Sequence, residues 1–146
     1  MKVTYRGDYA LKAVLDLALH HEKELVTIHD MAKRIDAPVK FLEQVLLELK
    51  RGGFVESRRG KVGGFLLSKS PDKITVGEVI RFVDGSTDPI ACVKHGYSAC
   101  RDVYRCVFKN IWKDVAKATS DIIDNITFED LAVQAGAAGQ VLEYSI

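Results

Sequence analysis

The amino-acid sequence predicts a mainly α fold: a winged helix-turn-helix with a small β-hairpin wing and a long C-terminal dimerisation helix. Two observations lead to this prediction. An amphipathic helical pattern that begins at Pro38 runs directly into two short strand-like runs joined by a basic, glycine-rich tip. Farther along, apolar residues from Tyr104 to Ile122 recur at steps of four and three, which is typical of a helix that packs along a seam.

The first two helices are expected from apolar periodicity and capping residues. Tyr9–His20 has an apolar face, and Asp8 just before it suits an N-cap or a first helical turn. Thr27 and the Asp three residues later resemble a capping box that opens a short helix, Ile28–Ile35. A turn at Asp36 then leads into the next helix.

The central helix and hairpin follow. Pro38 suits the first turn of a helix because its missing N–H would have no partner there, and Gly52-Gly53 ends that helix. Residues 54–57 and 65–67 are expected to be strands, and residues 58–64 form the tip of the hairpin. Two short helices joined by a tight turn, followed by a hairpin, complete the motif.

The remaining elements are less uniform. Thr75 is expected to cap a helix over Val76–Val83, and residues 85–103 have no regular pattern. The seam is expected to lie on one helix with the apolar residues Tyr104, Phe108, Ile111, Val115, Ala118 and Ile122. Thr127 is expected to cap a last short helix ending at Ala135, and the glycines that follow indicate a flexible tail.

Composition narrows the function classes. The 146 residues have a net charge of only +1, but residues 1–69 carry 13 Lys and Arg against 9 Asp and Glu, while residues 70–146 carry 8 against 11. The basic excess of +4 therefore lies with the predicted winged helix. No apolar run is long enough for a membrane span, and a cytoplasmic protein is expected. We find no nucleophile–base pattern and no phosphate-binding loop, so the sequence does not predict an enzyme.

Double-stranded DNA is the partner expected for the winged helix. Lys40, Glu43, Gln44 and Leu47 share one face of the central helix, and the first three are side chains that bond base edges or phosphates. The hairpin tip adds three cations, Arg58, Arg59 and Lys61. A solvated polar face with simple turn glycines is the alternative, as is a winged domain that binds proteins instead of DNA.

Three cysteines, Cys92, Cys100 and Cys106, are spaced C-x7-C-x5-C in the irregular segment. An odd number in a cytosolic chain argues against a disulfide framework. Zinc sites usually have paired C-x2-C knuckles, which are absent from this sequence. Three thiolates with a fourth ligand from elsewhere suit an iron–sulfur cluster better. Thiol oxidation and simple burial as small apolar residues remain open.

The sequence resembles the Rrf-two family of bacterial winged-helix regulators, in particular its cluster-binding subset of the IscR and NsrR types. The resemblance lies in YALKAVLDLA near the N-terminus, in the wing RG-x2-GGF joined to ITVGEVI, and in the three cysteines. It implies a homodimeric transcription regulator that binds a pseudo-palindromic operator, with a long helix, Tyr104–Asp124, crossing its partner. It also implies that the cysteines hold a [2Fe–2S] or [4Fe–4S] cluster that senses cluster status, nitric oxide or redox state.

The resemblance assigns roles to further residues. Lys40, Glu43 and Gln44 would read bases, and Arg59 would enter a minor groove. Some members supply the fourth cluster ligand from a histidine three residues after the last cysteine, where this chain has Lys109. Others use a carboxylate from the partner subunit's first helix, and Asp8 occupies that position. The sequence organisation is thus expected to be a DNA-binding domain (1–84), a cysteine-bearing cluster loop (85–106), and a dimerisation helix with a C-terminal tail (107–146). A cluster-free regulator that responds to thiol oxidation or to a protein partner is the alternative.

Overall fold

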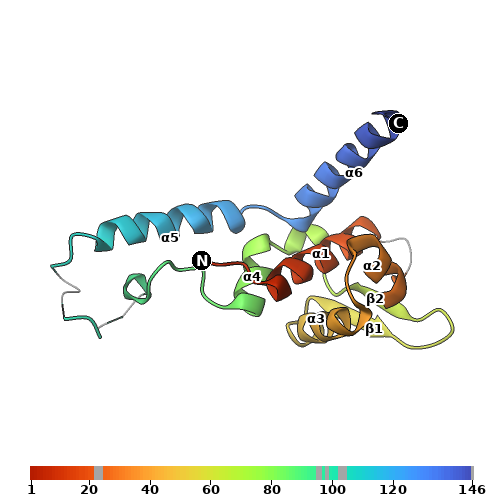
Figure 1. Ribbon diagram of the computed structural model, residues 1–146, viewed down its shortest axis with the longest axis horizontal. Coiled ribbons are helices and arrows are strands. Elements are labelled where there is room, and N and C mark those ends of the chain that lie inside the picture. Colours follow the sequence, from red (N-terminus) through yellow and green to blue (C-terminus); the bar gives the residue numbers. More distant parts are fainter. Residues whose placement is uncertain (22–24, 95–96, 98, 102–104, 146) are drawn as a thin grey trace.

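Short helices packed around α1 (Tyr5–Leu19) form one end of the molecule, and α5 (Lys109–Ile123) and α6 (Phe128–Ser145) extend from it in different directions (Figure 1). The computed structural model describes residues 1–21, 25–94, 97, 99–101 and 105–145, with side chains in α6 as far as Ala137. A helix-turn-helix and a two-stranded antiparallel hairpin are both present, so the predicted winged helix-turn-helix is confirmed.

Helix α1 begins four residues earlier than predicted. Thr4 is its N-cap, with a hydroxyl that accepts a hydrogen bond from the Gly7 N–H at 3.0 Å. Asp8 therefore lies in the first turn and is not the N-cap, because the threonine hydroxyl already serves the free N–H groups. Helix α2 (Ile28–Ile35) begins as predicted, with Thr27 accepting from the Asp30 N–H at 3.2 Å. It ends at Asp36, which is left-handed with φ 52°.

Helix α3 (Val39–Arg51) runs into the hairpin of β1 (Val55–Arg58) and β2 (Gly64–Leu67). Pro38 is the N-cap of α3, one position before the expected first turn. In the hairpin, Val55 lies opposite Leu67 and Arg58 lies opposite Gly64. Gly64 approaches the backbone of Val26 so closely that a Cβ would lie 2.7 Å from the Val26 carbonyl oxygen.

The hydrophobic core lies where α1, α3 and α4 (Val76–Asp84) meet. It contains Ala10, Val14, Leu42, Leu46, Leu49 and Val79, all fully or almost fully buried. Phe128, the first residue of α6, is also fully buried in this core. Asp16 is buried in α1, but its carboxylate accepts two hydrogen bonds from Arg34 at 2.8 and 2.9 Å, which joins α1 to α2.

The second half of the chain follows the prediction in order but not in its helix boundaries. Helix α4 has the complete capping box of Thr75 and Glu78 and ends at Asp84, followed by Gly85 with φ 88°. Between α4 and α5, the described residues contain one short 3₁₀ turn, Ala91–Val93 (η2), and are otherwise irregular, as predicted. Another 3₁₀ turn, Pro71–Lys73 (η1), precedes α4.

Two predicted boundaries are wrong. Helix α5 begins at Lys109 and not at Tyr104, because Val107 and Phe108 form a turn and Cys106 is irregular; residues 102–104 lie outside the described part of the chain. Helix α6 continues to Ser145, so no flexible tail begins at Gly136. Each glycine in a helix costs only about 1 kcal/mol relative to alanine, and the neighbouring Ala, Gln, Leu and Glu residues favour a helix without any interrupting proline.

Candidate functional site

Helix α3 divides cleanly into a buried face and an exposed face. Leu42, Val45, Leu46 and Leu49 are buried, and Lys40, Glu43, Gln44 and Leu47 are exposed on the other side. Within the described residues, the side chains of Lys40, Glu43 and Gln44 have no hydrogen-bond or ion-pair partner. The polar groups that the sequence singles out are therefore available to a ligand.

The hairpin presents its cations to solvent at and beside its tip, which is shorter than predicted because Arg58 is the last residue of β1 and Gly64 the first of β2. Arg58, Arg59 and Lys61 are exposed, and Val62 beside them is 85% exposed. Gly60 has φ 129°, a left-handed conformation that a residue with a Cβ rarely adopts, so the tight tip depends on glycine. The tip thus forms a small protruding cationic surface, as expected of a wing.

Two side-chain contacts fix α3 relative to its neighbours. Lys50 Nζ donates a hydrogen bond to Ser57 Oγ at 2.7 Å, which ties the end of α3 to β1. Glu48 pairs with Arg6 of α1, with Arg6 Nε 3.4 Å from Glu48 Oε2. Both contacts use polar residues of α3 that lie next to the exposed face, and they hold this helix against the hairpin on one side and α1 on the other.

The three cysteines line one pocket. A cavity of about 460 Å³ is bounded by Cys92, Cys100 and Cys106 together with Ile90, Ala91, Tyr97, Phe108 and Trp112. All three thiols are free; Cys100 is exposed, and Cys92 and Cys106 are half-buried. In the part of the chain that the structure describes, no three His, Cys, Asp or Glu side chains lie close enough to form a finished metal centre. Three thiol donors in a largely apolar, partly aromatic lining are the type of surroundings that suit a sulfur-ligated cluster.

Asp8 lies on α1 and is not among the residues that line this pocket. Its carboxylate lies 2.8 Å from Lys12 Nζ, and this hydrogen bond raises the pKa of Lys12 above its usual value. Both side chains are about half exposed, so the pair lies open to a second subunit. His95, which the cysteine loop also contains, lies outside the described residues.

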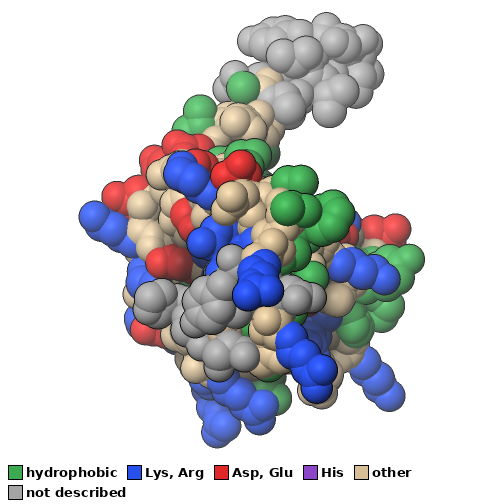
Figure 2. Space-filling model, turned by 90° about the vertical axis from the view of Figure 1, so that its left-hand side faces the viewer, with side chains coloured by type: hydrophobic (Ala, Val, Ile, Leu, Met, Phe, Trp, Pro, Cys, Tyr) green, Lys and Arg blue, Asp and Glu red, His purple; other side chains and the backbone are tan. Residues whose placement is uncertain are grey.

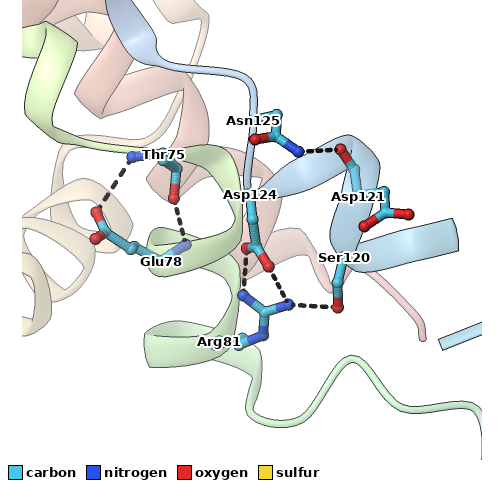
Figure 3. A network of polar contacts seen from close by, with 7 residues as sticks. All are labelled: Thr75, Glu78, Arg81, Ser120, Asp121, Asp124 and Asn125. Atoms are coloured by element: carbon cyan, nitrogen blue, oxygen red, sulfur yellow. Dashed lines mark hydrogen bonds and ion pairs between the residues drawn. The ribbon is translucent and has the colours of Figure 1, made fainter. Parts of the chain in front are cut away.

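The last turn of helix α4 is bonded both to the end of α5 and to the start of α1. Its Arg81 forms ion pairs and hydrogen bonds with Asp124 and donates to Ser120 Oγ at 3.1 Å, at the end of α5 (Figure 3). Its last residue, Asp84, accepts hydrogen bonds from the backbone N–H and hydroxyl of Thr4 at the start of α1. Arg6 also donates to the Val83 carbonyl oxygen at 3.0 Å. Sequence reasoning missed these contacts, since they join residues 39 to 80 positions apart and leave no local pattern.

The seam residues of α5 remain uncovered. Phe108, Ile111, Val115 and Ile122 are 58%, 51%, 42% and 60% exposed, and α5 has no buried residue. Figure 2 views the molecule from the end at which α5 lies, and apolar side chains gather on one flank while Lys and Arg side chains project from the lower edge. A row of exposed apolar residues at heptad spacing is typical of a helix that packs on another chain.

None of the described helices has the length and apolar character needed to cross a bilayer.

Comparison with known proteins places these features in a family. Residues 3–134 match the Rrf2 family model, described as an iron-dependent transcriptional regulator. The chain is 38% identical over 131 residues to the HTH-type transcriptional regulator IscR of Pectobacterium carotovorum, an alignment that covers 90% of this chain and 79% of that protein.

Two solved structures are similar over most of their length. T. potens IscR has a TM-score of 0.73 and 31% identity, covering 94% of this chain and 90% of the other. CymR of B. subtilis, described as the global cysteine regulator, has a TM-score of 0.77 and 28% identity, covering 92% and 98%.

Proposed function

This chain belongs to the Rrf2 family of transcriptional regulators, and from that membership we propose that it is a cytoplasmic homodimer that couples an iron–sulfur cluster to operator binding. The family consists of DNA-binding transcription regulators and not of enzymes. The proposal of a cluster and a dimer rests on the shared pocket of Cys92, Cys100 and Cys106. This pocket lies next to the start of α5, which has an uncovered apolar seam.

The DNA-reading part of the proposal rests on α3 and the hairpin. The unpartnered Lys40, Glu43 and Gln44 would face base edges in the major groove, where Gln bonds adenine, Glu accepts from cytosine and Lys reaches guanine or phosphate. Arg59 at the protruding tip would enter the adjacent minor groove, and its neighbours Arg58 and Lys61 would contact phosphates. The bond between Lys50 and Ser57 would hold these two reading elements in register.

Dimerisation is supported by the seam of α5. Apolar residues half exposed along one side of a projecting helix are unfavourable in water, and a second copy would cover them through a two-fold interface. Two reading heads related by two-fold symmetry would match a pseudo-palindromic operator.

The cysteine pocket would hold the cluster through Cys92, Cys100 and Cys106, whose thiols would lose their protons and bind iron as thiolates. A bound cluster would be altered or lost on exposure to oxidants or nitric oxide, or when iron is scarce. We propose Asp8 of the partner subunit as the fourth ligand. Within one chain Asp8 lies on α1 and does not line the pocket, and its half-exposed carboxylate is accessible to a second subunit. Three thiol ligands are compatible with a [2Fe–2S] cluster and with a [4Fe–4S] cluster.

Helix α4 would carry the signal. It contacts the end of α5 through Arg81 and the start of α1 through Asp84, and α1 in turn contacts α3 through Arg6 and Glu48. A shift of α5 or of the cysteine loop would therefore reach the reading helix through a chain of polar contacts. This amounts to allostery when the DNA affinity differs between the cluster-bound and cluster-free forms.

The test is anaerobic purification followed by a visible absorption spectrum with iron and acid-labile sulfide assays. Broad sulfur-to-iron absorption with matching iron and sulfide is expected, with loss in Cys100→Ala and retention in Lys94→Ala, an exposed change in the same segment. Operator binding is then measured with and without cluster.

A colourless protein that cannot be reconstituted would overturn the cluster proposal. A regulator that changes its DNA affinity on thiol oxidation would take its place, because three free thiols line one pocket.

A further inference from the structure

Leu47 is the exception among the apolar residues of α3. Four of the seven apolar residues in this helix are buried, and two more, Val39 and Phe41, pack against the core from its edge. Leu47 is 44% exposed and does not belong to the core or to the residues packed against it. Its side chain therefore contributes little to holding α3 in the domain.

Leu47 also lies in line with the free polar groups of α3. Lys40, Glu43, Gln44 and Leu47 fall at positions i, i+3, i+4 and i+7, which is the spacing that a recognition helix presents to base edges in a major groove. The polar residues that flank it are occupied within the chain, Glu48 by Arg6 and Lys50 by Ser57. Leu47 is thus the remaining free side chain at the end of this row.

We infer that Leu47 is a specificity-determining residue that contacts the C5-methyl group of a thymine in each half-site. This inference rests on the proposed function, since it requires α3 to lie in the major groove. A leucine side chain has no donor or acceptor, and the thymine methyl is the apolar group that a base pair presents in that groove. Apolar contact there favours T·A over C·G at one position without a hydrogen bond.

The inference also predicts where the thymine lies relative to the base pair that Gln44 reads. Leu47 follows Gln44 by three residues, or about 4.5 Å along a helix axis, while successive base pairs are about 3.4 Å apart. The thymine is therefore expected one or two base pairs from the position that Gln44 reads. An adenine read by Gln44 and a nearby methyl contact would together define part of the half-site.

The experiment removes the methyl group without changing base pairing. An operator is selected from random duplexes with the full-length protein, and each thymine is then replaced in turn by uracil. Removing one methyl contact is expected to weaken binding about fourfold in one half-site and about fifteenfold in both. Leu47→Ala is expected to bind the thymine operator more weakly and to bind thymine and uracil operators equally.

Leu19→Ala is the matched control, because it truncates an exposed leucine of α1 outside the reading surface, and it should keep the full thymine preference. If wild-type protein binds duplex DNA but shows no sensitivity to uracil, or if Leu47→Ala keeps that sensitivity, the inference is wrong. If the wild-type protein selects no operator and binds without steep salt dependence, the proposed function itself fails.

Discussion

Arg81 of α4 holds Asp124, the residue that ends α5, through both terminal nitrogens of its guanidinium group, with Nη2 3.1 Å from Asp124 Oδ2. The hydrogen bond raises the pKa of Arg81 above its usual value. A two-point guanidinium–carboxylate contact fixes direction as well as distance. We therefore expect this contact to orient α5 where it is joined to α4 (Figure 3).

We expect this pair to show measurable coupling in a double-mutant cycle. Arg81→Ala and Asp124→Ala should share an interaction free energy of about 0.5–1 kcal/mol, because both side chains are more than a third exposed and water screens them. Urea denaturation of the wild type, the two single variants and the double variant measures it. Strict additivity would show that the contact does not orient α5. Arg81→Lys keeps the charge but loses the planar group that bonds the carboxylate at two points, so it should recover only part of the coupling.

Arg59→Ala in the wing should weaken operator binding and lower its dependence on salt. Each cation that leaves a phosphate or minor-groove contact reduces the slope of log affinity against log salt by about 1, so a dimer should lose about 2. Fluorescence anisotropy at several salt concentrations measures the slope. Lys73→Ala removes another exposed cation, from η1, and serves as the control. An unchanged slope in Arg59→Ala would count against the wing contact.

Ile111→Asp should disrupt the dimer. Ile111 is half exposed on the seam of α5, and a carboxylate placed in an apolar interface would cost more than about 2 kcal/mol, or about thirtyfold in dimer affinity. Light scattering coupled to gel filtration distinguishes a wild-type dimer from a monomeric variant. Lys113→Asp introduces the same group on the same helix away from the seam, and it should remain dimeric. A dimeric Ile111→Asp protein would place the interface elsewhere.

Asp8→Ala should shorten the lifetime of the cluster in air without unfolding the protein. As a first-turn acid, Asp8 contributes only about 0.5 kcal/mol to helix stability. Lys12→Ala removes the partner of Asp8 within the chain and leaves the carboxylate in place, so the cluster should persist. Decay of the visible absorption after exposure to air compares the three proteins. Equal decay in all three would exclude Asp8 as a ligand across the dimer.

Local signals in the sequence predicted most of the fold. Thr27, Thr75 and Thr127 each accept a hydrogen bond from an N–H three residues later, so a pattern of four residues suffices to find the caps. The amphipathic α3 and the glycine-rich tip are equally local. The start of α1 at Tyr5, capped by Thr4, was missed because the apolar pattern begins only at Tyr9, although a threonine cap needs no apolar neighbour.

The coupling contacts could not be predicted in the same way. Thr4 and Asp84 are 80 positions apart, and Arg81 and Asp124 are 43 apart, so only the folded chain brings them together. The gathering of three cysteines around one pocket likewise depends on the path of an irregular loop. The assignment of Asp8 to the cluster stays a prediction, because it depends on how two subunits meet.

The burial of Phe128 has a consequence for how this chain can be made. The aromatic ring fills the core of the winged domain, yet it lies at the start of the last helix, after the whole cysteine segment and α5. A ribosome must therefore synthesise α5 before the winged domain can close its core. A shortened chain that stops at residue 84 would expose the cavity that this ring fills, and a large aromatic lost from a core costs about 3–5 kcal/mol. During synthesis, the segment that reads DNA thus lacks the stabilisation from Phe128 until the cysteine segment and α5 have been made.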